Sequence, residues 1–363
     1  MDRPLVPGFA GLVFALSTVC AAAQAIVAPR PATPVEPVAA LIDALRSHDV
    51  VALDEGAHGN EQGHALRLAL IRHPAFAGAV NDIVVEFGSA RYQDVIDRFV
   101  RGEPVDHDTL RHVWQDTTQH GVWDVPMYEA FFRAVRAINA PLARDRQVRV
   151  LLGDPPIDWA QIRTPQDHFA WLRKRDTHAA DLIQREVLAK RRRALLLYGG
   201  IHLQRRHISA NYEPIDDADT VISILDRARS ARIFTVATPA TIDLQTLQAT
   251  VASWPVPSLA MLRGTELGAI DYARYVPSET TRFAVKDGVP APLPREQWRV
   301  KPMEDQFDAV LYLGPLSTIT LEKLPPALCG DAAYLRMRRE RLVALNQRAE
   351  ADRFERSCRS TGH

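Results

Sequence analysis

Residues 50 to 59 read Val-Val-Ala-Leu-Asp-Glu-Gly-Ala-His-Gly, an apolar run that leads directly into a polar turn containing two glycines. An uninterrupted apolar run of this length is typical of a strand that is buried on both faces. The helical pattern Glu61–Arg72 follows it closely. Because a buried strand followed by a helix is half of a βαβ unit, this stretch predicts a parallel sheet.

The same alternation continues along the chain. Further strands are predicted at Ile83–Val85, Val148–Leu152, Ala194–Tyr198, Ile233–Ala237 and Phe307–Leu313. Helices are predicted at Tyr92–Arg101, Thr109–Gln119, Pro126–Asn139, Gln166–Lys190 as one long helix, Thr220–Arg229 and Ala332–Ala351. We therefore predict an α/β fold with a mainly parallel central sheet flanked by helices. The helices between Thr109 and Asn139 and the proline- and glycine-rich region after Thr238 should form a helical and irregular wall over the carboxyl ends of the strands.

The two ends of the chain differ in composition from this middle part. Residues 1–25 have Arg3, an apolar run and the small-residue ending Ala23-Gln24-Ala25, which is typical of a signal peptide and predicts export to the periplasm or outside the cell. A lipoprotein signal that uses Cys20 is the less favoured alternative. Residues 26–37 form a proline-rich leader, residues 38–351 the α/β domain and residues 352–363 a C-terminal tail.

Bulk composition limits the classes of partner. The 44 basic and 44 acidic side chains cancel, so no overall field attracts nucleic acid, and we expect no nucleic-acid partner. After the signal no segment approaches the length of a transmembrane helix, so the mature protein should have no integral membrane segment. Cys329 and Cys358 remain after cleavage; a disulfide and two unpaired thiols are equally open.

Ionisable side chains follow four of the predicted strands. The first strand leads to Glu55 and His58, the second to Glu86, the third to Asp154, and the fourth to His202. Ligands bind at the carboxyl ends of parallel strands, where such side chains converge. A buried strand needs only turn-forming residues at its exit, so packing alone does not account for the set. Taken singly, each residue could instead cap a helix or form a turn.

The residue types suggest acid–base chemistry. Glu55 and His58 lie three positions apart on one turn, so the carboxylate can raise the basicity of the imidazole and make His58 a general base. Glu86 could hold a water or take the proton, and His202 could protonate a leaving group or bind an oxyanion. Arg175 offers a cation to the site, and Asp176 offers a partner that orients this cation. The alternative for these two residues is an exposed ion pair on a helix. Asp154 is a further electrostatic candidate.

A metal site is a second possibility for the same set. Glu55, His58, Glu86 and His202 together are an acceptable oxygen and nitrogen donor set for a divalent metal. The chain has no His-Glu-x-x-His motif, no phosphate-binding Gly-x-x-x-x-Gly-Lys loop, no Gly-x-Ser-x-Gly elbow and no dinucleotide fingerprint after a strand. Nucleotide binding and serine-hydrolase chemistry therefore lack their motifs.

These motifs resemble the erythromycin-esterase-like family, which forms a larger group with the haem-binding uptake (ChaN-like) proteins and the Tiki-type metalloproteases. The resemblance covers most of 50–203 and the strand 307–312. The family's Gly-Glu-x-x-His-Gly turn is similar to the sequence Asp54–Gly59, and its second strand likewise ends in a glutamate, here Glu86. Its Gly-x-Asp strand end loosely matches Gly153-Asp154, its Arg-Asp-x-x-Met-Ala helix motif matches 175–180, and its last strand and histidine match 195–202.

The resemblance implies water activation by His58, with Glu55, Glu86 and His202 completing the site, Arg175 close by and no covalent intermediate. The chain departs from the family at Asp54, which replaces a glycine, and at Gly199-Gly200, which replaces His-Asn. The second departure removes a polar group from the expected site, so the resemblance does not extend to a macrolide substrate for this chain. We predict an exported hydrolase that cleaves an ester, lactone or related bond of a small molecule, with no cofactor expected. The alternatives are a haem-binding protein and a metal-dependent peptidase.

Overall fold

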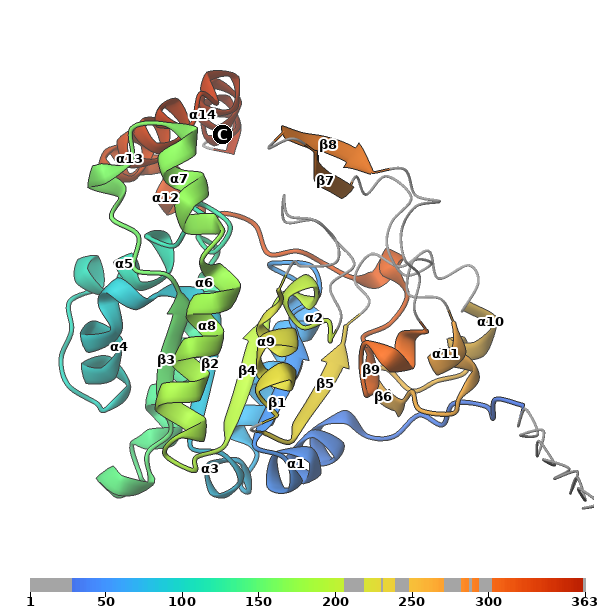
Figure 1. Cartoon of the computed structure of the whole chain (residues 1–363). Coiled ribbons are helices and arrows are strands. Elements are labelled where there is room, and N and C mark those ends of the chain that lie inside the picture. The colour runs from blue at the N-terminus through green and yellow to red at the C-terminus, as the bar shows by residue number, and fades with distance from the viewer. Residues whose placement is uncertain are drawn as a thin grey trace, which may run out of the picture.

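The computed structural model describes residues 28–205, 219–229, 231–238, 248–270, 282–286, 289–293 and 302–361. Its main sheet has seven strands in the order β3-β2-β4-β1-β5-β9-β6 (Figure 1). β6 is antiparallel to β9, and the other neighbouring pairs are parallel. The predicted fold class is therefore confirmed. The strands are β1 (Val50–Asp54), β2 (Asp82–Ser89), β3 (Arg149–Asp154), β4 (Ala194–Tyr198), β5 (Ile233–Ala237), β6 (Ser258–Met261) and β9 (Ala309–Tyr312); β7 (Arg282–Lys286) and β8 (Val289–Leu293) form a separate antiparallel pair.

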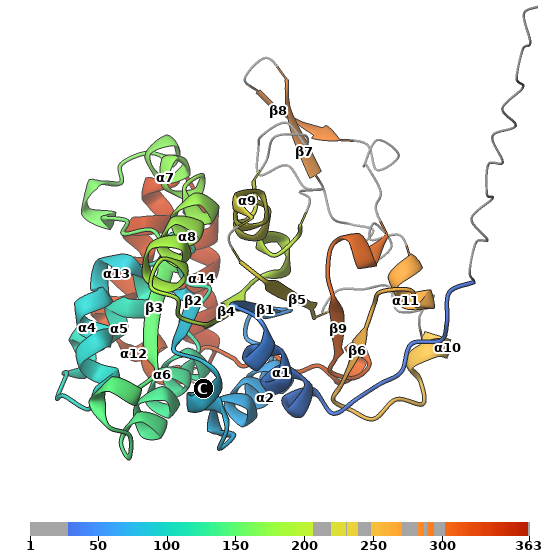
Figure 2. The same ribbon diagram turned by 60° about the horizontal axis from the view of Figure 1, so that its bottom comes forward.

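Helices cover both faces of the main sheet (Figure 2). Val51 and Leu53 of β1 face a core shared with α1, α2, α4, α5 and α6, whereas Val50 and Ala52 face a core shared with α8 and α9. Burial on both faces explains why the strands are continuous apolar runs. The helices are α1 (Pro37–Ser47), α2 (Glu61–Arg72), α3 (Phe76–Ala79), α4 (Gln93–Val100), α5 (His107–Gln115), α6 (Pro126–Asn139), α7 (Pro165–Leu172), α8 (Arg175–Ile183), α9 (Val221–Ala228), α10 (Gln248–Val251), α11 (Glu266–Ala269), α12 (Pro326–Gly330), α13 (Ala332–Ala344) and α14 (Arg348–Thr361).

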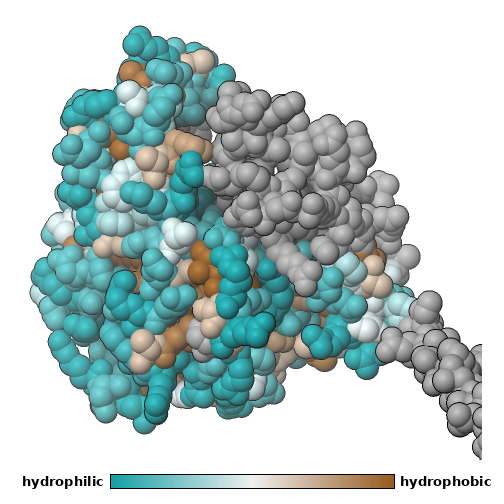
Figure 3. All heavy atoms as spheres, viewed as in Figure 1, coloured by the Kyte–Doolittle hydropathy of each residue, from teal (hydrophilic) through white to brown (hydrophobic). Residues whose placement is uncertain are grey.

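The exterior seen in Figure 3 is mainly hydrophilic over the described residues, with hydrophobic residues in small separate patches. Within the described part of the chain, no helix combines the length and apolar character needed to cross a bilayer. The predicted signal peptide, residues 1–25, and Cys20 lie outside the described residues.

The predicted long helix Gln166–Lys190 is wrong. The structure has two helices, α7 and α8, with Arg173 and Lys174 between them, and a π-helical turn at Gln184–Leu188. The two helices lie in different environments, because α7 contributes no buried residue and α8 buries six, among them Arg175. Helix-forming residues on both sides of the break conceal it in the sequence. The helix predicted over Thr109–Gln119 also stops early, at Gln115, and its last residues enter a loop.

The C-terminal boundary predicted from the sequence is also wrong. The helix expected over Ala332–Ala351 is interrupted after Ala344, where Asn346 adopts a left-handed conformation with φ of 60°. A residue of this type and conformation commonly ends a helix. A second helix, α14, then runs through the expected tail 352–363 as far as Thr361. Cys329 and Cys358, left open above, are joined in a disulfide between α12 and α14.

The described part of the proline-rich leader packs onto the domain. The Val35 amide donates to the Leu259 carbonyl at 2.8 Å, and the Leu259 amide donates back at 3.0 Å, which extends the sheet beside β6. Arg30 bridges to Thr265 in the same region. The predicted boundary between leader and domain at Val38 therefore does not mark the beginning of the packed structure.

Candidate active site

The strand ends that carry the predicted site residues are neighbours in the sheet. The order β3-β2-β4-β1 places the exits of four consecutive strands side by side. Asp54 of β1 is in register with Tyr198 of β4, and Ser89 of β2 with Asp154 of β3. The predicted residues Glu55, His58, Glu86, Asp154 and His202 therefore lie along one edge of the sheet, with Arg175 and Asp176 added from α8.

The turn after β1 is fixed by its own residues and by two other segments. Gly56 and Gly59 have φ of 73° and 80°, conformations that favour glycine. The Asn60 side chain caps α2 and donates to the carbonyls of Glu55 and Ala57 at 2.8 and 2.7 Å. Tyr128 of α6 accepts a hydrogen bond from the Gly59 amide at 2.9 Å. The Gly59 carbonyl accepts one from the Glu322 amide at 2.8 Å, so the segment before α12 also holds this turn.

Glu55 orients His58 within this turn. Glu55 is buried, and its Oε2 lies 3.1 Å from Nδ1 of His58; its Oε1 lies 3.4 Å from the buried Arg67 guanidinium. The His58 side chain is 34% exposed, and among the described residues its Nε2 has no hydrogen-bond partner. The ring edge meets Trp123, with the ring centroids 4.4 Å apart.

The pKa of His58 is raised above its ordinary value. Burial alone would lower the pKa, but the hydrogen bond with Glu55 and the negative charges of Glu86 and Glu55 outweigh burial and the opposing charge of Arg175. An imidazole of this kind changes its charge above pH 6.5, and its neutral form is a competent base near neutrality.

Glu86 is a buried anion whose two oxygens are both occupied. Oε1 accepts from the Arg175 guanidinium and lies 3.5 Å from Nε2 of His202, and Oε2 accepts from the Gly199 amide at 2.6 Å. Burial alone would raise the pKa of Glu86, but Arg175, His202 and His58 together lower it to about 2. Glu86 therefore stays ionised and fixes its neighbours, which differs from the predicted role of a group that takes the proton from water.

His202 is held by carboxylates on both sides. Its Nδ1 lies 2.8 Å from Oδ1 of Asp176, and its ring is buried. The same Asp176 oxygen accepts the Val221 amide at 3.0 Å, at the beginning of α9. Asp176 and Arg175 are thus buried members of this network, and the exposed ion pair considered from the sequence is not what the structure shows.

Asp154 joins the network through Arg175. It lies 3.5 Å from Nε of Arg175, and its two oxygens accept from the amide and the hydroxyl of Thr118 at 2.7 and 2.5 Å. Burial raises the pKa of Asp154 to about 7, although Arg175 and Thr118 oppose the shift. This carboxyl group therefore changes its charge near neutrality and links the loop after α5 to the site.

The surroundings of Gly199, directly after β4, are the clearest evidence that the predicted site residues lie close together. A Cβ atom added there would lie 3.4 Å from Oε2 of Glu86, 3.7 Å from Cε1 of His58 and 3.9 Å from Cδ2 of His202. The neighbouring Gly200 leaves no such room, since its Cβ would lie 2.5 Å from Oδ2 of Asp54. The glycine pair thus separates the exposed histidine from the buried network.

Sequence reasoning missed several side chains of this site. Arg67 pairs with Glu55, Tyr128 holds the Gly59 amide, Thr118 holds Asp154, and Trp123 packs against His58. Asp54 accepts from the amides of Gly56 and Thr238, and burial raises its pKa to about 6. The sequence could have indicated Arg67, because it is an arginine on the buried face of α2. The other missed side chains have no local sequence pattern that marks them. The helices α5 and α6, expected to form a wall, pack in the core instead, and the site is reached by the loop between them and by Tyr128 of α6.

The metal-ligand alternative has poor geometry. Glu86 is already paired with Arg175, and Glu55 with Arg67, so guanidinium groups occupy the cation positions beside both carboxylates. Over the described residues, no three histidine, cysteine, aspartate or glutamate side chains are spaced to hold one ion. The donor set as arranged here therefore does not fit a metal.

Comparisons with known proteins show the fold. No family model matches the chain, and no curated protein does. A solved structure of a succinoglycan biosynthesis protein is similar at a TM-score of 0.52 and 9% identity, covering 81% of this chain and 96% of that one. A Bacillus cereus protein is similar at 0.52 and 10%, covering 81% and 97%. An erythromycin esterase mutant in its open conformation is similar at 0.48 and 10%, covering 79% and 94%. At 9–10% identity, the two likenesses with a TM-score of 0.52 show the α/β fold alone.

Proposed function

We propose that this protein is a hydrolase in which His58 activates water to cleave an ester, lactone or related bond of a small molecule. One observation carries the proposal. His58 is the partly exposed member of an otherwise buried charged network, its Nδ1 faces the carboxylate of Glu55, and its Nε2 is free of partners among the described residues. A histidine oriented in this way by a buried carboxylate is the usual form of a general base.

The roles follow from these contacts. Nε2 of His58 takes a proton from the attacking water, and Glu55 stabilises the imidazolium that forms. As the bond from the carbonyl carbon to the leaving oxygen breaks, the imidazolium returns this proton to that oxygen. Arg175, buried beside Glu86, contributes positive charge where the attacked carbonyl oxygen becomes negative. Glu86 and His202 hold the exit of β4 and Arg175 in place. This mechanism needs neither a nucleophilic side chain nor a metal, and the pairing of both carboxylates with arginines supports the metal-free form.

Export is part of the proposal. Residues 1–25 have the composition of a signal peptide. The disulfide between Cys329 and Cys358 supports the same location, because such bonds persist in oxidising compartments.

The test is hydrolysis of a panel of chromogenic esters and lactones by the mature protein and by His58→Ala, each with and without chelator. We expect turnover that depends on His58 and survives chelator. His48→Ala is a matched control, because His48 lies half-buried at the end of α1. Loss of turnover with chelator would overturn the metal-free mechanism. Absence of turnover on every substrate, together with a Soret band on haem titration, would favour the haem-binding alternative.

A further inference from the structure

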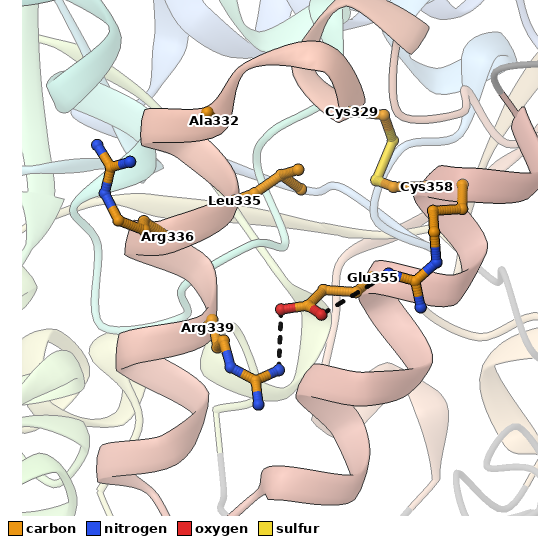
Figure 4. Close-up of a pocket in the computed structure, with 8 residues that line it drawn as sticks. Cys329, Ala332, Leu335, Arg336, Arg339, Glu355 and Cys358 are labelled. Carbon is orange, nitrogen blue, oxygen red and sulfur yellow. Dashed lines mark hydrogen bonds and ion pairs between the residues drawn. A yellow bond between two sulfur atoms is a disulfide. The ribbon is translucent and has the colours of Figure 1, made fainter.

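The last three helices form a unit that we name the C-terminal clasp, residues 326–361. The disulfide joins α12 to α14, and Arg339 of α13 pairs with Glu355 of α14 at 2.8 Å (Figure 4). Arg339 also pairs with Asp352 of α14 at 3.1 Å. A pocket of about 400 Å³, which both cysteines line, lies between these helices. The clasp is therefore held together by a covalent bond and by ion pairs.

The clasp contacts the rest of the protein through polar groups and through one small apolar cluster, in which Leu345 packs with Ile157 and Ile162. Neither of the two large apolar cores contains a residue of α12, α13 or α14. The buried side of α13 carries Leu342 and three side chains with polar groups, Tyr334, Arg338 and Arg341. Arg341 donates to the Gln115 carbonyl at 2.6 Å and pairs with Asp116. All three α13 side chains thus face the loop after α5.

This loop, residues 116–124, depends on those contacts. Four buried side-chain atoms in it have no hydrogen-bond partner among the described residues: Thr117 Oγ1, Gln119 Oε1, Trp123 Nε1 and Asp124 Oδ1. Each such atom costs about 1–3 kcal/mol. Arg338 donates to Nδ1 of His120 at 2.6 Å, and it packs so closely over Gly121, whose φ is 83°, that a Cβ there would overlap its guanidinium. The loop is therefore stabilised from outside, by α13.

Two short connections lead from this loop to the site. Asp124 accepts from the Tyr334 hydroxyl at 2.5 Å and lies 3.8 Å from Nε of Arg338, and the adjacent Trp123 packs against the His58 ring. Thr118, at the other end of the loop, holds both oxygens of Asp154. Trp123 is fully buried, so it supports His58 from beneath without an exposed surface for substrate.

We propose that the C-terminal clasp positions His58: Tyr334 and Arg338 fix Asp124, and Trp123 next to it fixes the imidazole. The catalytic part of this inference rests on the proposed function, whereas the positioning of His58 does not. Tyr334, Arg338 and Trp123 are positioning residues. The disulfide ties α14 to α12, directly before α13, and so supports the packing of α14 on α13 beyond the surface ion pairs, which contribute little.

The test compares Arg338→Ala and the milder Tyr334→Phe with Arg336→Ala. Arg336 lies on the same helix but is exposed, and it points away from the disulfide in Figure 4. We expect the first two variants to lower kcat by about tenfold or more with KM nearly unchanged, because a misplaced base slows the chemical step. Arg336→Ala should match the parent protein. Equal kcat in Tyr334→Phe, Arg338→Ala and the control would overturn the inference.

A second readout is independent of activity. Diethyl pyrocarbonate modifies neutral imidazole, and the rate at His58 is measured by peptide mass spectrometry against His48 as an internal reference. Loss of support from Trp123 should raise the rate at His58 several-fold in Arg338→Ala, and also in the double variant Cys329→Ala/Cys358→Ala. An unchanged rate of modification at His58 in folded variants would contradict the inference. A raised rate in a protein that hydrolyses nothing would support positioning while the proposed function fails.

Discussion

The turns after β1 and β4 are alike in sequence and different in chemistry. Each follows a buried parallel strand, contains two glycines and carries a histidine. His58, after β1, is partly exposed and uses one ring nitrogen to contact a carboxylate. His202, after β4, is buried, and both ring nitrogens face carboxylates, those of Asp176 and Glu86. Of the two histidines, only His58 has a second ring nitrogen without a partner among the described residues, so only His58 suits the role of base that we propose.

The largest expected effect separates the two histidines by activity. His58→Ala should lower kcat/KM by about 10²–10⁴-fold, the usual contribution of a general base, with little change in the free energy of unfolding. Ester hydrolysis and urea unfolding measure the two quantities. A His58→Ala variant that unfolds or retains full turnover would contradict this distinction between the two histidines.

The next effect separates them by stability. His202→Ala should lower the free energy of unfolding by about 2–4 kcal/mol, because it leaves the buried carboxylates of Asp176 and Glu86 without this partner. Urea unfolding of this variant beside His58→Ala provides the measurement. Equal stability of the two alanine variants would show that His202 is not part of a buried network.

The adjacent glycines sharpen the comparison further. Gly200→Ala should cost about 1–3 kcal/mol of stability, since its Cβ would collide with the carboxylate of the half-buried Asp54, 2.5 Å away. Gly199→Ala should fold normally, with its nearest contact at 3.4 Å, and reduce turnover only a few-fold by narrowing the space beside His58. Thermal unfolding and kinetics distinguish the two, and the opposite order of stability would contradict the geometry.

The smallest effect is a displacement of the pH profile. Because Glu55 raises the pKa of His58, the midpoint of the rising limb of kcat/KM should lie at a higher pH than for an ordinary imidazole. Glu55→Gln removes that charge, so the pKa falls and the rising limb of the profile moves towards acid. A profile with its midpoint unmoved, measured under otherwise identical conditions, would show that Glu55 does not act on His58.

Most of the sheet could be predicted from the sequence because its strands are uninterrupted apolar runs. The predicted bounds of β4 and β5 coincide with the observed ones, and the rule that ligands meet at strand carboxyl ends brought Glu55, Glu86, Asp154 and His202 together. Local patterns of this kind predict strands correctly because each strand is buried on both faces and therefore needs apolar residues.

The parts that could not be predicted depend on contacts between distant segments. The break before Arg175 lies between good helix formers, and only the packing of α8 shows it. Trp123 looks like any core residue until its contact with His58 is seen. The polar face of α13 looks like a solvated helix, yet Arg338 and Arg341 are buried there against a loop from another part of the chain. Tertiary packing overrode propensity at each of these places.

The attachment of α13 to the loop after α5 has a consequence for how the protein matures. The turn that carries His58 is synthesised long before Tyr334 and Arg338, which lie far downstream in the sequence. A nascent chain can therefore complete its β1 turn and its first helices and still lack a correctly placed base. With the role that we propose for the clasp, His58 is correctly placed only once the chain has been translated through α13.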